Sequence, residues 1–158
     1  IIIFNKALGD KKEVTKLNVM VDSSSSTINN IDEGSEYFKR KQKIFSFFFK
    51  SKKIIQEQQN IKVERLSDII KSQKINHINL LKIDTEGYEL NVLNGIDDED
   101  YKKINFIYFE HHYDLMIKKK YKFSDINLFL NERNFLLKYK LKMNLRKSFE
   151  YIYENTKK

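Results

Sequence analysis

The sequence predicts an α/β domain, and three features of the chain carry this prediction. An apolar run at residues 80–83 ends abruptly in Asp84 and Glu86, and apolar residues with helical spacing follow at 90–96. A second apolar run, residues 104–109, also ends in polar groups. Buried parallel strands have this form because both of their faces are covered. The last part of the chain instead alternates apolar and polar residues, with the two-residue period of strands that have one wet face.

The amino-terminal part is expected to form strands before a less regular segment. Residues 1–8 are apolar and end at a Gly-Asp turn, and a second extended segment is expected at 14–21. A polar loop follows at 23–30. Residues 31–60 are charged and glutamine-rich and contain a knot of phenylalanines, so we expect an insertion or a lid. The alternative is a surface insertion whose aromatic residues pack on the main core. A short strand is expected at 61–63.

Helices are expected to alternate with the two apolar strands. Ser67 is expected to cap a short helix, because a serine hydroxyl accepts a hydrogen bond from a free backbone N–H at a helix start. The buried strand at 79–84 and a helix at 88–93 come next, before the strand at 104–109. Ser124 is expected to cap another helix, whose apolar residues recur at a spacing of three and four.

The end of the chain is expected to form an antiparallel hairpin. Leu137, Tyr139 and Leu141 alternate with lysines, and Tyr151 and Tyr153 alternate with glutamates. A short polar connection joins the two segments. Since directly opposed residues of two strands interact, we expect a lysine face to meet a glutamate face.

Composition favours one folded domain. The chain has 158 residues, 41% of them hydrophobic and 13% aromatic, which suffices for a core. It has no cysteine, so disulfides and thiolate chemistry are excluded and a cytoplasmic location is the simplest expectation. No apolar run approaches the roughly 18 residues of a membrane helix. Because the chain begins with Ile1 and not methionine, we expect residues 1–158 to be one partial domain, the carboxy-terminal part of a longer protein.

The net charge of +8 raises nucleic acid as a partner, but two observations weaken this hypothesis. Only four of the 30 basic residues are arginine, the residue that makes bidentate contacts to bases. The lysines are also spread along the whole chain. By contrast, residues 84–100 hold seven carboxylates and no basic residue. We therefore expect no specific nucleic-acid partner, and an acidic site that suits a cationic cofactor.

The acidic segment also carries a specific resemblance. It reads LLKIDTEGYELNVLNGI and resembles the central motif of the FkbM-type methyltransferases, enzymes that use S-adenosylmethionine. The matching positions are Lys82, Ile83, Asp84, Glu86, Gly87, Tyr88, Glu89, Val92, Leu93 and Gly95. So long an ordered match is far more specific than a lone glycine pattern.

The resemblance extends beyond the motif, over about two thirds of the chain. Residues 5–10 resemble the third strand and turn of that family, 61–84 its approach to the motif strand, and 109–111 the end of its fifth strand. The implied fold is a Rossmann-like methyltransferase sheet, mostly parallel with a carboxy-terminal antiparallel hairpin, in the strand order 3-2-1-4-5-7-6. The first strand and its glycine-rich turn have no counterpart here, so we expect the amino-terminal strands of the sheet to be missing.

The resemblance also implies site residues. The expected catalytic residues are Asp84, Glu110 and His111, at the carboxyl ends of two neighbouring strands, and the expected cofactor-binding residues are Asn5, Ala7, Asp84, Glu86 and Gly87. A carboxylate beside a histidine is enough to take the proton of a hydroxyl group. No metal is expected, because adjacent histidines on a strand point to opposite faces.

Simpler roles remain open for the same residues. Asp84 could satisfy free N–H groups at the start of the next helix, where Glu86 and Glu89 are also favoured by the helix dipole. Tyr88 could be a packing residue. Either His111 or its neighbour could be an ordinary hydrogen-bonding residue.

The implied function is methyl transfer from S-adenosylmethionine, with a hydroxyl of a sugar or another secondary metabolite as the acceptor. Two alternatives of other classes stay open. One is a non-catalytic or degenerate binding module that keeps the fold, and the other is a basic nucleic-acid-binding protein.

Overall fold

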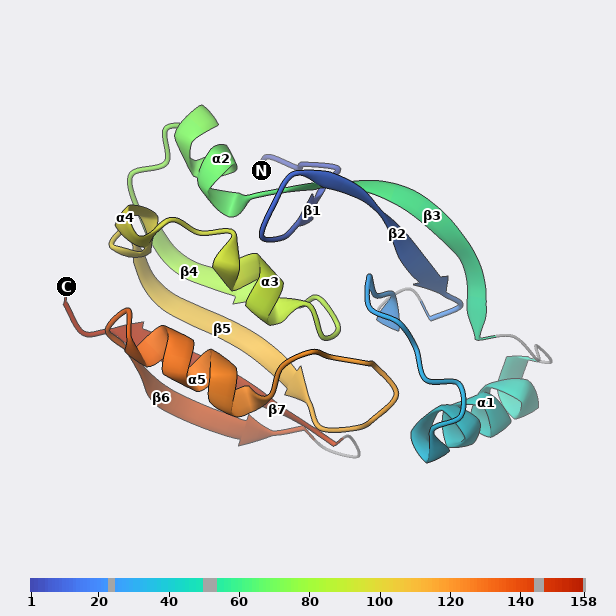
Figure 1. Ribbon diagram of the computed structural model, residues 1–158. Coiled ribbons are helices and arrows are strands. Elements are labelled where there is room, and N and C mark those ends of the chain that lie inside the picture. The colour runs from blue at the N-terminus through green and yellow to red at the C-terminus, as the bar shows by residue number, and fades with distance from the viewer. Residues whose placement is uncertain (23–24, 50–53, 144–146, 158) are drawn as a thin grey trace.

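The computed structural model describes residues 1–22, 25–49, 54–143 and 147–157, and within them the chain forms two separate β-sheets with helices beside them (Figure 1). The strand order is β1-β3-β2 in the first sheet and β4-β5-β7-β6 in the second. Both sheets contain parallel and antiparallel pairs. The expected α/β class is confirmed.

The first sheet is built around the long strand β3 (Ile55–Glu64). β2 (Glu13–Met20) runs antiparallel to nearly all of β3, which confirms the extended segment expected there. β1 (Ala7–Leu8) runs parallel to the end of β3, with Ala7 opposite Val63.

Two expectations for this sheet are wrong in extent. The strand expected at residues 1–8 is reduced to its last two residues, because only these pair with β3, and Ile1, Ile2 and Ile3 are exposed. The strand expected at 61–63 is in fact ten residues long. Its earlier part is polar on both faces, so no alternation of apolar residues marked it.

The second sheet contains β4 (Ile78–Ile83), β5 (Ile104–His112), β7 (Ser148–Asn155) and β6 (Phe135–Lys142). β4 and β5 are parallel, whereas β5–β7 and β6–β7 are antiparallel. The carboxy-terminal hairpin is therefore confirmed. The expectation of a mostly parallel sheet is wrong for the described residues, since three of the five strand pairings across the two sheets are antiparallel.

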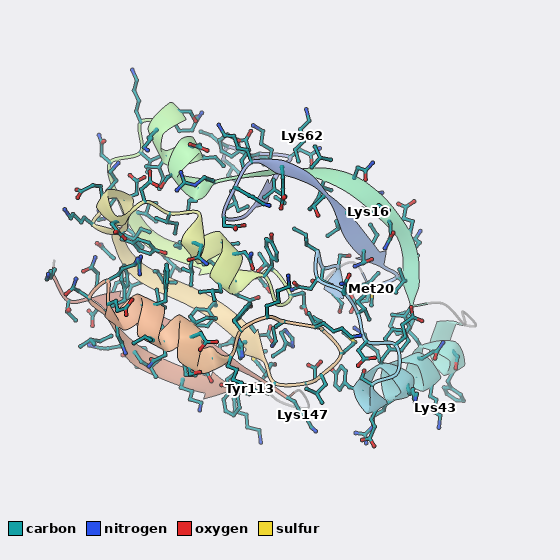
Figure 2. The ribbon with its side chains drawn as sticks, viewed as in Figure 1. Lys16, Met20, Lys43, Lys62, Tyr113 and Lys147 are labelled. Atoms are coloured by element: carbon teal, nitrogen blue, oxygen red, sulfur yellow. The ribbon has the colours of Figure 1, made fainter. Side chains whose placement is uncertain are left out.

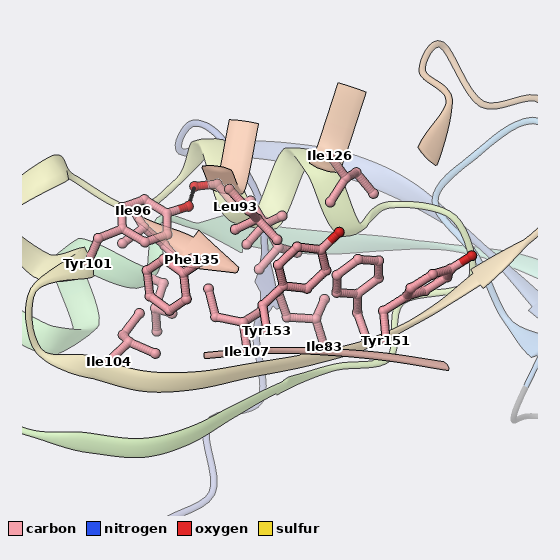
Figure 3. Packing of buried hydrophobic residues seen from close by; sticks show 14 of the residues in the cluster. Ile83, Leu93, Ile96, Tyr101, Ile104, Ile107, Ile126, Phe135, Tyr151 and Tyr153 are labelled. Carbon is pink, nitrogen blue, oxygen red and sulfur yellow. Dashed lines mark hydrogen bonds between the residues drawn. The ribbon is translucent and has the colours of Figure 1, made fainter. Parts of the chain in front are cut away.

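Four short helices lie close to the second sheet: α2 (Leu66–Ser72), α3 (Glu89–Asn94), α4 (Asp98–Tyr101) and α5 (Phe123–Asn131). The main core forms where α3 and α5 cover one face of this sheet. Figure 3 shows Leu93 and Ile126 above Ile107 and Tyr153, all of them almost completely buried. The hydroxyl of Tyr101 donates a hydrogen bond to the backbone oxygen of Leu93 and ties α4 to α3.

Neither expected serine cap forms. α2 begins after Arg65 without a side-chain cap, and the Ser67 hydroxyl instead accepts a hydrogen bond from the backbone N–H of Asp97. At α5 the Asp125 carboxylate accepts a hydrogen bond from the backbone N–H of Lys122, so the cap position lies two residues earlier than expected and a different side chain is used. Both serines were plausible caps by residue type, but Ser67 bonds to the distant Asp97 and the Ser124 hydroxyl bonds to its neighbour Asp125.

The segment expected to be an insertion or a lid divides between a helix and a strand. α1 (Glu36–Phe49) lies apart from the main core in Figure 1, and the remainder enters β3. Phe38 of α1 packs in a second, smaller cluster with Met20, Ile54 and Met116. Whether α1 acts as a lid stays a prediction. No helix in the described part of the chain is both long and apolar enough to cross a membrane.

The pairing of faces in the hairpin differs from the expectation. Lys138 pairs with Glu154 at 2.8 Å, but a bulge between Leu137 and Tyr139 shifts the register beyond it. Lys140 consequently lies over the rings of Phe149 and Tyr151, with no glutamate opposite it, and the apolar side chains of β6 turn to solvent. The sheet face away from α3 and α5 thus carries exposed apolar residues on both outer strands: Leu80, Leu136, Tyr139 and Leu141.

Candidate functional site

The carboxyl ends of β4 and β5 lie side by side because these strands are parallel, with Ile83 opposite Phe109. In open sheets, ligands bind outside this edge of parallel strands. The chain leaves β4 at Asp84 and reaches α3 through a tight loop. Two consecutive loop residues have positive φ, Glu86 at 49° and Gly87 at 92°. Left-handed backbone is costly for a residue other than glycine, so Glu86 must be held in place by its surroundings.

The loop is held from outside by the segment after β2. Thr27 donates its hydroxyl to the backbone oxygen of Glu86 at 2.8 Å, and Asn29 donates its amide to that of Gly87 at 2.5 Å. A Cβ at Gly87 would lie 2.8 Å from a methyl of Ile117 and 3.1 Å from the Asn29 amide. Glycine is therefore required here for both space and conformation.

The loop is also held from inside by the Glu89 side chain, which is almost completely buried. One Glu89 oxygen accepts the backbone N–H of Gly87 at 2.8 Å and the Thr85 hydroxyl at 3.2 Å. The other accepts the hydroxyl of Tyr121 at 2.5 Å. Together these bonds fix the loop between β4 and the segment that follows β5.

Four ionisable side chains meet beside this loop, and they are its main chemical feature. His112 Nε2 lies 3.3 Å from Glu86 Oε2 and 3.5 Å from Glu110 Oε1, and His112 Nδ1 lies 3.6 Å from Asp114 Oδ2. All four side chains are nearly buried. One histidine thus lies among three carboxylates, and we call this group the His112 cluster.

Electrostatics favour a protonated His112. Burial alone would lower the pKa of His112, but its contact with Asp114 and the charges of Glu86, Glu110 and Asp114 outweigh burial and raise that pKa. Burial also acts against the charge of Asp114, yet His112 and the backbone N–H of Met116 lower the Asp114 pKa. For Glu86 burial dominates over the attraction of His112, and its pKa is raised.

Glu110 is the member of the His112 cluster with spare hydrogen-bonding capacity. Its buried Oε1 accepts no hydrogen bond from any described residue. Across the sheet it lies directly opposite Glu150, a carboxylate that accepts a hydrogen bond from Tyr108. A buried acceptor without a donor is costly in a folded protein, and such atoms often take part in function.

His111 lies on the opposite face of β5, as strand alternation requires. Its ring is buried against Tyr113, Tyr121 and Phe123, with ring centroids 4.9, 6.0 and 5.9 Å away. Burial, with Lys119 and His112 nearby, lowers the pKa of His111 to about 3, so its ring is neutral. Its Nδ1 has no hydrogen-bond partner among the described residues.

A cavity of about 480 Å³ is lined by His111, by its aromatic neighbours and by other residues of the segment that follows β5. Lys119 lines this cavity and donates to the backbone oxygen of His112. Burial lowers the pKa of Lys119, although Glu89, Asp114 and Glu86 oppose this effect. The cavity therefore combines an aromatic wall with a half-buried lysine.

A larger cavity, of about 910 Å³, lies between β1 and β4 and brings together residues far apart in the sequence. Asn5 and Ala7 line it from the amino-terminal side, and Asp84 and Tyr88 from the motif loop. Asp84 is half exposed there and pairs with Lys82 at 2.9 Å. This volume lies within the range of small-molecule and cofactor sites.

The expected site residues thus fall in three places. Asn5, Ala7 and Asp84 share the larger cavity, Glu86 and Glu110 share the His112 cluster, and His111 lines the smaller cavity. Gly87 contributes backbone to the loop between them. No contact joins Asp84 to Glu110 directly, because these side chains pair with Lys82 and with His112 respectively.

Sequence reasoning missed the centre of the charged group. His112, which is next to His111, holds the carboxylates, and Asp114 two residues later completes the arrangement. The alternation of a strand that continues past Phe109 would have placed Glu110, His112 and Asp114 on one face. The roles of Thr27 and Asn29 could not be predicted from the sequence, because they bond to loop residues that are far away along the chain.

Metal ligation finds no support in the geometry. Among the described residues, no group of three or more histidine and carboxylate side chains is arranged to hold a metal ion. The His112 cluster is an ion-pair arrangement, with His112 between the carboxylates.

Comparison with known proteins identifies the family. The sequence model of the family described as "Methyltransferase FkbM domain" matches residues 2–137, most of the chain. The chain belongs to the FkbM methyltransferase domain family. Among curated proteins, "Methyltransferase 1" of Beauveria bassiana (strain ARSEF 2860) is 39% identical over 61 residues, which is 37% of this chain and 24% of that protein. The match thus spans about a quarter of the relative's length. No solved structure gives a significant match.

Proposed function

We propose that this FkbM domain takes part in methyl transfer from S-adenosylmethionine to a hydroxyl oxygen, on a sugar or another secondary metabolite. The observation that carries the proposal is the motif loop of the family, which here lies at the carboxyl ends of parallel strands beside a buried, charged centre. The family match supports methyl transfer in general, and the hydroxyl acceptor is proposed because the resemblance of the motif to FkbM-type enzymes implies it.

The residues of the larger cavity fit the proposed cofactor. Asn5 offers an amide and Asp84 a half-exposed carboxylate, while Ala7 leaves room for a flat ring. Glu86 and Gly87 do not line the cavity, but they would fix the loop that carries Asp84, because Thr27 and Asn29 hold their backbone oxygens. The cofactor supplies a methyl group that its positive sulfonium already activates, so the protein has to align the reactants and exclude water.

The proposed base is Glu110. A hydroxyl oxygen becomes a better nucleophile as its proton leaves. The buried Glu110 Oε1 atom accepts no hydrogen bond from any described residue, although His112 Nε2 lies 3.5 Å from it. Protonated His112 would hold Glu110 and Glu86 in fixed positions. His111, neutral and with a free Nδ1, would accept a hydrogen bond and orient the acceptor in the smaller cavity.

The surface charge gives less support to nucleic-acid binding. Figure 2 labels lysines on three separate parts of the molecule: Lys43 on α1, Lys147 before β7, and Lys16 and Lys62 on the paired strands β2 and β3. Nucleic-acid-binding surfaces instead gather their basic residues on one face or along one helix.

A non-catalytic binding module is the second candidate, and one observation favours it. Asp84 is paired with Lys82 and half exposed, so it lies apart from the His112 cluster. A module of this kind would bind S-adenosylmethionine or a related nucleoside without transferring the methyl group.

Labelled methyl transfer tests the proposal. The protein that carries this chain is incubated with methyl-labelled S-adenosylmethionine and a panel of methyl glycosides, phenols, carboxylic acids and amines. We expect label only in the hydroxyl compounds, as base-stable ethers. Asp84→Asn should lower the single-turnover rate at least tenfold, about 1.4 kcal/mol of transition-state stabilisation. Asp98→Asn, at a largely exposed carboxylate of α4, is the matched control. Label only in amines or carboxylic acids, or an unaltered rate in Asp84→Asn, would defeat the proposal.

A further inference from the structure

Glu89 is a buried carboxylate that the proposed chemistry does not use. Its relative exposure is 1%, yet it is the first residue of α3 and carries a full set of partners. Those partners come from two segments: Thr85 and Gly87 on the motif loop, and Tyr121 in the segment that follows β5. A carboxylate buried only for helix stability would not need bonds to both.

We propose that Glu89 is the positioning residue of the His112 cluster: its hydrogen bond to the Gly87 N–H fixes the left-handed loop that places Glu86 against His112. The catalytic meaning of this role rests on the function proposed above. The geometric role does not, because it concerns contacts within the folded chain.

The loop geometry shows why such a residue is needed. Glu86 adopts a φ of 49°, which a residue with a side chain populates only when neighbours enforce it. Thr27 and Asn29 hold the two loop carbonyl groups, but the Gly87 N–H is held by Glu89. Without that acceptor, the peptide between Glu86 and Gly87 is held only at its carbonyl oxygen, by Thr27, so it rotates more easily and the Glu86 carboxylate shifts with it.

The simpler alternative is that Glu89 only places a negative charge at the first turn of α3, where the helix dipole favours it. The two roles differ in what Glu89→Gln should do. Glutamine keeps an acceptor for the Gly87 N–H but loses the charge, so a positioning role survives this change in large part. A purely electrostatic role would be lost equally in Glu89→Gln and Glu89→Ala.

The measured pKa of His112 reports the position of Glu86, because the Glu86 carboxylate lies 3.3 Å from His112 Nε2. Besides Glu86, the groups that face His112 are Glu110, Asp114 and Lys119. The chain has three histidines, so NMR titration of the folded chain resolves each imidazole. We expect Glu89→Ala to lower the His112 pKa by about one unit and Glu89→Gln to lower it by less than half as much. Glu99→Ala, at a largely exposed glutamate, is the control and should leave the His112 pKa unchanged.

Equal effects of Glu89→Ala and Glu89→Gln, or no effect of Glu89→Ala, would overturn the proposal. Should Glu89→Ala not fold, amide exchange in Glu89→Gln decides. Hydrogen bonds to a charged acceptor are roughly twice as strong as neutral ones, so the Gly87 amide should exchange about tenfold faster than in the wild type. The Gly95 amide bonds to backbone oxygens of α3 and serves as the reference. A Gly87 amide that already exchanges as fast as an unprotected amide in the wild type would refute the positioning role, because the Glu89 bond would then not hold it. Neither readout depends on methyl transfer, so the two proposals can fail separately.

Discussion

Acid should destabilise this protein through His111, which is buried as a neutral ring. The ring lies among three aromatic side chains and has no carboxylate partner, while the pKa of His111 falls from 6.5 to about 3. Protonation must therefore either unfold this part of the chain or leave a charge buried among aromatic rings. His111→Phe removes the titrating group and keeps a flat ring in the same place.

The size and sign of the effect follow from linkage. The folded-state pKa lies below the unfolded value, so the unfolded chain binds the proton first and stability falls as the pH drops below 6.5. Each pH unit in this window costs about 1.4 kcal/mol, so about 2 kcal/mol is lost by about pH 5. His112 acts in the opposite direction. The pKa of His112 is raised in the folded state. Its contribution to the free energy of unfolding is therefore complete below pH 6.5 and is lost as the pH rises through the folded-state pKa.

Urea unfolding at about pH 7.5 and about pH 5 measures this difference. The wild type should lose about 2 kcal/mol more than His111→Phe over that interval. His112→Gln should show the opposite sign and lose more stability than the wild type as the pH falls. A difference between wild type and His111→Phe that stays constant with pH would show that His111 is not buried as a neutral group.

Three further predictions follow from the loop, the core and the surface charge. Gly87→Ala forces a side chain into the left-handed region and against Ile117, and should cost about 1–3 kcal/mol in urea unfolding; Gly34→Ala, which meets only Asp32, should stay within about 0.5 kcal/mol. Ile107→Ala empties a fully buried site and should cost about 2–5 kcal/mol, while Leu80→Ala on the exposed sheet face should cost far less. Binding to DNA or RNA should be weak and fall steeply with salt in a filter-binding assay, and sequence-selective submicromolar binding at physiological salt would contradict this account.

Much of the fold near the motif could be predicted, because it is written in local patterns. The runs at β4 and β5 are apolar on both faces, and α3 and α5 carry apolar side chains at helical spacing. The observed order of the second sheet, β4-β5-β7-β6, also agrees with the 4-5-7-6 order that the family resemblance implied. A Rossmann-like arrangement of the strands stays a prediction.

The rest could not be predicted because it depends on contacts between distant segments. Ser67 had the right chemistry for a helix cap, but in the structure its hydroxyl accepts a hydrogen bond from the backbone N–H of Asp97 instead. The bulge after Leu137 shifted the register of β6 against β7, and no residue type in the sequence indicates such a bulge. At the site, strand alternation gave the opposite faces of His111 and His112, but not that His112 would lie among three carboxylates.

Binding of S-adenosylmethionine tests the central claim most directly, because it requires no knowledge of the acceptor. Isothermal titration calorimetry on the protein that carries this chain compares the wild type with Asp84→Asn, in the larger cavity, and with Asp98→Asn on α4. The account predicts binding by the wild type and by Asp98→Asn, and an affinity at least tenfold lower for Asp84→Asn, about 1.4 kcal/mol. No binding by the wild type, or equal affinity in Asp84→Asn, would contradict the account.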